Sequence, residues 1–89
     1  MDTTSAPIRL DLLPIGKLAT IVELEPIDGE TDFPIRLAHL GILPGELIKT
    51  IRRAPFFADP LIIVIKGCQM ALTVKEASSI IVRIQTQEI

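Results

Sequence analysis

The chain has 89 residues, the length of a single domain, and its hydrophobic content of 48% supports a packed core and argues against disorder. Its net charge is −2, and it contains three Phe but neither Trp nor Tyr. It therefore lacks the basic field that nucleic-acid binding requires. It also lacks the aromatic platform on which bases stack or proline-rich peptides dock.

The apolar residues are distributed over short segments. The longest apolar run, Leu61–Ile65, is far shorter than the about 20 residues of a membrane-spanning helix, so direct membrane insertion is not expected. The N-terminus has no apolar segment of the secretory type. The single cysteine, Cys68, has no internal disulfide partner. These features favour a reducing, cytoplasmic location.

The first third of the chain predicts an arm, a strand and an acidic loop. We expect residues 1–9 to form a flexible arm and residues 10–89 to form the folded domain. Leu10–Pro14 is compatible with a short turn or strand, whereas Leu18–Leu24 is rich in branched residues and lacks Gly and Pro, as a strand does. The next stretch is acidic, with five carboxylates at Glu23, Glu25, Asp28, Glu30 and Asp32. Their spacing does not follow a calcium-loop pattern, which favours a solvated loop over a cation site.

The middle of the chain predicts a short helix followed by a sharp turn. Leu37 and Leu40 are three positions apart and would share the buried face of the helix. Gly41 follows them, where the end of a helix favours a left-handed backbone. Pro44 and Gly45 have the order typical of the central positions of a type II turn. We therefore interpret Gly41, Pro44 and Gly45 as structural turn residues.

The second half of the chain predicts further strands and one more helical turn. Thr73 and Glu76 have the spacing of a capping box, which predicts a brief helix that ends near Ser79. The chain is thus predicted to contain about five short strands and one or two helical turns. A sheet of this size commonly closes into a barrel, which leaves no edge strand unpaired. The predicted fold class is all-β, a small SH3-like antiparallel barrel. Its later strands are expected at Leu47–Arg53, Leu61–Ile65, Cys68–Leu72 and Ile80–Gln85.

The expected core and the expected contact surface follow from alternation along these strands. If Leu61, Ile63 and Ile65 point inward, then Ile62 and Val64 point outward. By the same rule, if Ile48 and Thr50 point inward on the preceding strand, Leu47 and Ile51 join the outward apolar patch. The predicted core comprises Leu37, Leu40, Ile42, Ile48, Leu61, Ile63, Met70, Leu72, Ala77, Ile80 and Val82. The predicted partner-binding residues are Arg52, Arg53, Phe56, Phe57, Ile62 and Val64.

The sequence contains none of the local signatures of an enzyme. It has no glycine-rich phosphate loop, no nucleophile motif and no Cys/His cluster with zinc spacing. His39 and Cys68 lie on different predicted elements, and neither has a second ligand of its type. We therefore expect no catalytic residue, no cofactor and no metal site.

Several segments together resemble ferrous iron transport protein A, the FeoA family. The first is Arg36-Leu37-x-x-Leu40-Gly41-Ile42-x-Pro44-Gly45. The others are Arg53-Ala54-Pro55 followed by Asp59-Pro60, then Gly67, Ala71-Leu72 and Glu76-Ala77-x-x-Ile80-x-Val82. Each segment alone is weak, but their order and spacing are specific, and they cover Leu10 to Ile84.

The resemblance implies an SH3-like barrel and a small cytoplasmic protein that is not an enzyme. It also implies that the partner is FeoB, a membrane transporter of ferrous iron with a cytoplasmic GTPase domain, which this chain would bind and regulate. Ile62 and Val64 stand where charged residues would be expected to alternate, and Phe56 and Phe57 stand where small or polar residues are usual. Both departures favour an apolar contact surface, for FeoB or for a second copy of this chain. The alternatives are a nucleic-acid-binding barrel and an iron-binding role.

Overall fold

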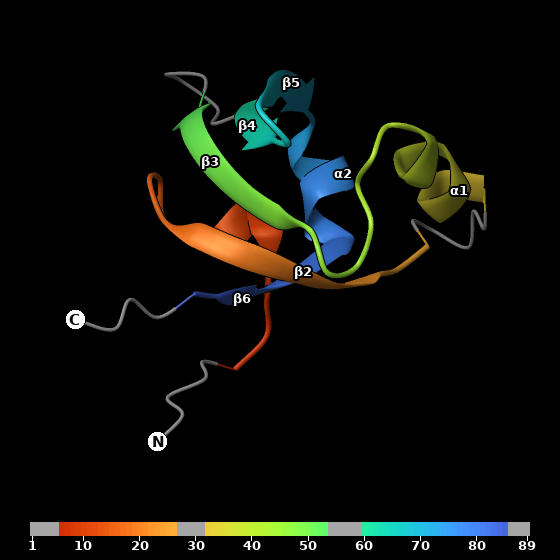
Figure 1. The fold of residues 1–89 in the computed structure, drawn as a ribbon, viewed down its shortest axis with the longest axis horizontal. Helices are drawn as coiled ribbons and strands as arrows, with labels where there is room; N and C mark the ends of the chain where they lie inside the picture. The colour runs from red at the N-terminus through yellow and green to blue at the C-terminus, as the bar shows by residue number, and fades with distance from the viewer. Residues whose placement is uncertain (1–5, 27–31, 54–59, 86–89) are drawn as a thin grey trace.

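Six antiparallel strands form one curved sheet in the computed structural model, which describes residues 6–26, 32–53 and 60–85. The strand order is β1-β6-β2-β3-β4-β5, and the sheet curls into a small barrel, with α1 standing to one side (Figure 1). The predicted fold class is therefore confirmed. The elements are β1 (Ile8–Arg9), the 3-10 turn η1 (Leu10–Leu12), β2 (Leu18–Leu24), α1 (Asp32–His39), β3 (Leu47–Arg53), β4 (Leu61–Ile65), β5 (Cys68–Leu72), α2 (Val74–Ser78) and β6 (Ile80–Ile84).

The strand that the sequence did not predict is β1. Ile8 lies opposite Val82 and Arg9 lies opposite Ile81, so residues that we expected in the N-terminal arm extend the sheet beyond β6. The pairing is only two residues long and carries neither a clear alternation nor a turn signal. The five strands predicted from branched and alternating residues occur at the expected positions.

The core occupies the interior of the barrel and includes residues from both ends of the chain. Leu10 and Leu13 are completely buried, although the sequence did not place them in the core. They are three residues apart around η1, so both side chains point to the same side of the 3-10 turn, into the barrel. The buried apolar residues are Leu10, Leu13, Ala19, Ile21, Leu37, Ile42, Ile48, Leu61, Ile63, Ile65, Leu72, Ala77, Ile80 and Val82, with Met70 packed against them.

The prediction that Leu40 belongs to the core is wrong, because Leu40 is 57% exposed. Helix α1 ends at His39, and two backbone bonds then close a Schellman motif, in which the Ile42 N–H donates to the Leu37 oxygen and the Gly41 N–H donates to the Ala38 oxygen. This motif brings Ile42 back beside Leu37, and both are buried. Ile42 therefore takes the place beside Leu37 that the helical spacing had assigned to Leu40.

The predicted turn chemistry is confirmed. Gly41 and Gly45 have φ values of 88° and 94°. The Glu46 N–H donates to the Leu43 oxygen at 3.1 Å across the Pro44-Gly45 turn. Both glycines are thus needed for backbone conformation, which reverses the chain between α1 and β3.

The predicted capping box of α2 is also present. The Glu76 N–H donates to Thr73 Oγ1 at 3.0 Å, and the Thr73 N–H donates to Glu76 Oε1 at 2.9 Å. Ala77 is buried on the inner side of this helix, where α2 packs near η1. These local bonds fix the short connection that carries the chain from β5 to β6.

Candidate contact surface

The candidate site is built on β4, whose side chains alternate between the interior and the surface. Leu61, Ile63 and Ile65 are buried, whereas Ile62 and Val64 are half-buried, as the sequence predicted. The ladders with β3 and β5 then fix the neighbours of the two outward residues. Val64 lies opposite Lys49 and Gln69, and Ile62 lies opposite Arg52 and Ala71. We call these six residues (Lys49, Arg52, Ile62, Val64, Gln69 and Ala71) the outer face.

The outer face contains two cations, Arg52, which the sequence placed among the contact residues, and Lys49, which it did not. The ladder is irregular between Thr50 and Arg52, so that Arg52 rather than Ile51 lies opposite Ile62. Lys49 points outward by the same alternation that directs Leu47 outward, and it lies opposite Val64. The apolar side chains are therefore interleaved with positive charge.

These two cations have no anionic partner in the part of the chain that the structure describes. The side chain of neither Lys49 nor Arg52 makes a hydrogen bond or an ion pair there. The outer face also contains no carboxylate. A chain with a net charge of −2 thus presents a local positive field around the apolar residues Ile62 and Val64, and such a field attracts acidic groups.

Two exposed leucines extend the outer face across β2 and β3. Leu47 is 45% exposed and lies opposite Thr20, and Leu18 is 41% exposed and lies opposite Lys49. Leu18 and Leu47 are diagonal neighbours on one side of the ladder, a separation that long side chains can bridge. The apolar area therefore continues past Lys49 toward β2, a short distance from Val64.

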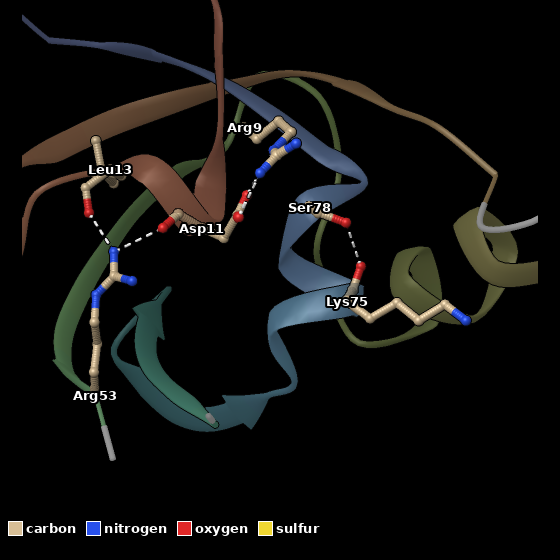
Figure 2. Close-up of polar contacts among 6 residues, drawn as sticks. All are labelled: Arg9, Asp11, Leu13, Arg53, Lys75 and Ser78. Carbon is tan, nitrogen blue, oxygen red and sulfur yellow. Dashed lines mark hydrogen bonds and ion pairs between the residues drawn. The ribbon is translucent and has the colours of Figure 1, made fainter. Parts of the chain in front are cut away.

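Arg53, which the sequence placed with Arg52 among the partner-binding residues, makes hydrogen bonds within the chain. It lies opposite the buried Leu61, and its Nη2 donates to the carbonyl oxygens of Asp11 at 2.9 Å and Leu13 at 3.0 Å. Figure 2 shows this guanidinium reaching from the end of β3 to η1. Arg53 therefore holds η1 against the end of the barrel, and we leave it out of the outer face.

The same end of the barrel contains a second arginine contact. Arg9 donates to both carboxylate oxygens of Asp11, at 3.0 and 2.9 Å (Figure 2). This hydrogen bonding, together with the charge of Asp11, raises the pKa of the Arg9 guanidinium. Asp11 is buried within η1, so the pair neutralises a carboxylate that would otherwise be costly to bury.

The remaining predicted site residues fall into two groups. Gly41, Pro44 and Gly45 form the turns described above, at the opposite end of β3 from Arg52. Phe56 and Phe57 lie outside the described residues. Within 6–26, 32–53 and 60–85, no group of three or more His, Cys, Asp or Glu side chains is placed to hold a metal ion. The described helices include none that is long and apolar enough to cross a membrane.

The comparisons with known proteins agree with this architecture. The FeoA domain family matches residues 8–84. The FeoA protein from Chlorobium tepidum superposes with a TM-score of 0.79 and 27% identity, covering 92% of this chain and 74% of that chain. Iron(II) transport protein A from Clostridium thermocellum superposes with a TM-score of 0.74 and 32% identity, covering 86% of this chain but only 45% of that chain.

A third solved structure supports the fold alone. It is the zinc complex of FeoA from Stenotrophomonas maltophilia, described as a procaryotic SH3 domain protein, with a TM-score of 0.74 and 24% identity over 84% of this chain and 88% of that chain. No curated protein matches the sequence.

Proposed function

Because the chain belongs to the FeoA family, whose domain spans residues 8–84, we propose that it is an accessory protein of ferrous iron transport that binds a FeoB-like membrane transporter. It acts in the cytoplasm, on the cytoplasmic part of the transporter, and regulates it through this contact. The family is associated with ferrous iron transport, which supports the transporter as the partner. The outer face supports a contact between proteins.

The observation that carries the proposal is that apolar and cationic side chains lie next to each other on the outer face. Ile62 and Val64 offer apolar area that a partner can cover, and the side chains of Lys49 and Arg52 stand beside them without a partner among the described residues. The complementary surface is an acidic segment with apolar side chains. Opposite charges of this kind accelerate association and select the partner, while the buried apolar centre supplies most of the affinity.

The proposal is tested by titrating the chain against the isolated cytoplasmic part of a FeoB-like transporter, with and without guanine nucleotide. The variant Lys49→Glu/Arg52→Glu reverses both charges of the outer face. We expect it to weaken binding at least about tenfold, equivalent to about 1.4 kcal/mol. We also expect wild-type binding to weaken as salt rises, because exposed charges are screened beyond about 8 Å at physiological ionic strength.

A matched control reverses a charge away from the outer face. Lys75 is exposed on α2, and Lys75→Glu should bind as wild type does. Equal binding by the double variant and by this control, with all three proteins folded, would exclude the outer face as the contact. In the same assay, any GTP hydrolysis should require the transporter fragment, and hydrolysis by the purified chain alone would contradict an accessory role.

A further inference from the structure

The strand at one edge of the sheet, β5, is accessible for pairing. It is the last strand in the order and, among the described strands, is hydrogen-bonded to β4 alone. Cys68, Gln69 and Ala71 are exposed along it. Figure 1 shows β5 at the margin of the barrel, with α2 leading away from it. An edge strand of this kind offers a row of backbone groups to another chain.

The turn between β4 and β5 identifies which of these backbone groups are free. Lys66 and Gly67 form a two-residue connection with φ values of 52° and 77°, as in a type I′ turn. The residues that flank such a turn, Ile65 and Cys68, are then a hydrogen-bonded pair, and the direction of the backbone groups alternates from there. Gln69 and Ala71 consequently direct their N–H and C=O groups away from β4. The turn, loop and side-chain hydrogen bonds among the described residues include none to either residue.

The residues of β5 do not protect this edge. The strand reads Cys-Gln-Met-Ala-Leu, without a charge or a proline, and its ladder with β4 runs without a bulge. Natural edge strands usually carry lysine, proline or a bulge that prevents pairing with another sheet. We propose that β5 pairs antiparallel with β5 of a second copy of this chain, which forms a two-fold symmetric dimer.

One register satisfies all the free groups of both copies. Gln69 pairs with Ala71 of the second copy, and Ala71 pairs with its Gln69, each pair exchanging two backbone hydrogen bonds. Met70 then lies opposite the second copy's Met70 at the symmetry axis, as a non-hydrogen-bonded pair. Cys68 lies opposite the second copy's Leu72. A contact that uses the same strand on both sides is the isologous kind that closes into a dimer.

The charges of the outer face favour a second copy as the occupant of this edge. Neutral β5 residues meet neutral β5 residues, so no like charges are brought together at the axis. Lys49 and Arg52 lie on β3, five strand spacings from their counterparts, or roughly 24 Å at about 4.8 Å per spacing. That separation exceeds the screening distance of about 8 Å. The two outer faces become one continuous surface with cations at both ends.

The register makes a specific prediction for disulfide cross-linking. Cys68→Ser/Met70→Cys places two thiols at the axis, where Cα atoms of a non-hydrogen-bonded pair are about 4.5 Å apart, within disulfide range. We expect this variant to form a covalent dimer on mild oxidation. The control Cys68→Ser/Gln69→Cys places its thiols on a diagonal of about 7–8 Å, beyond that range, and should cross-link at least about tenfold more slowly.

The mass in solution is the second measurement. The wild-type chain, 9.8 kDa as a monomer, should sediment as a dimer at about 100 µM, a concentration at which a micromolar contact is saturated. Ala71→Pro removes an edge N–H that β4 does not use, so it should leave the fold intact and give a monomer. A monomeric wild type, equal cross-linking of the two cysteine variants, or a dimer that a folded Ala71→Pro variant retains would overturn the proposal. None of these measurements involves the transporter, so they stand apart from the proposed function.

Discussion

Replacing Arg53 by methionine tests the contact that joins the end of β3 to η1. Methionine keeps most of the apolar stem of arginine but cannot donate the two hydrogen bonds to the carbonyl oxygens of Asp11 and Leu13. Leu13 is completely buried, so its carbonyl is left beside the core without a donor.

The magnitude follows from those two bonds. A hydrogen bond to a charged group contributes about 1.5–3 kcal/mol to stability. Because Arg53 is only half-buried, solvent weakens both bonds, and we expect their combined contribution to be about 2–4 kcal/mol. A domain of this size has a total stability of roughly 4–13 kcal/mol. The variant should therefore lower the melting temperature by roughly 10–25 °C.

The matched control is the neighbouring residue. Arg52→Met removes a cation that makes no hydrogen bond or ion pair among the described residues. It should change stability by less than about 0.5 kcal/mol, as most surface substitutions do. Urea denaturation of the three proteins gives the free energies of unfolding. Equal stability of the Arg53→Met and Arg52→Met variants would refute the role assigned to Arg53.

Three further substitutions test the interior and the turns by the same measurement. Leu37→Ala should cost about 2–4 kcal/mol and Leu40→Ala less than about 1 kcal/mol, because only Leu37 is buried; the reverse order would contradict the Schellman motif. Gly41→Ala should cost about 1–2 kcal/mol through its positive φ alone, since the added Cβ meets nothing closer than 3.9 Å, and a neutral effect would refute the left-handed requirement. Thr50→Val should stabilise the fold by about 1 kcal/mol, because the buried Oγ1 of Thr50 has no hydrogen-bond partner among the described residues. A destabilised variant would show that this hydroxyl is satisfied.

Local chemistry explains why the sequence predicted most of the elements. Runs of branched residues without Gly or Pro indicated the strands. Pro44-Gly45 indicated a turn, and Thr73 with Glu76 indicated a helix cap, because both depend only on contacts within four residues. The prediction for Leu40 failed for a related reason. Spacing alone cannot tell whether a leucine at the end of a helix is its last buried residue or lies just outside a glycine C-cap.

The contact surface depends on pairing that the sequence does not specify. Alternation correctly assigned Ile62 and Val64 to the outside of β4, and it could also have assigned Lys49. The irregularity in β3 that sets Arg52 opposite Ile62 has no local signal. The inward role of Arg53 depends on carbonyl groups 40 and 42 positions away in the sequence, so it emerges only from the fold.

The most direct test of the proposed contact is a residue-by-residue map of binding in solution. Amide chemical shifts of the labelled chain would be followed by NMR while the unlabelled cytoplasmic part of a FeoB-like transporter is added. We expect the largest changes at Lys49, Arg52, Ile62 and Val64, with little change at Leu10 or Leu13, which are completely buried at the end of the barrel. Changes centred on α1 or on η1, with the outer face unaffected, would contradict the proposal that the outer face binds the transporter.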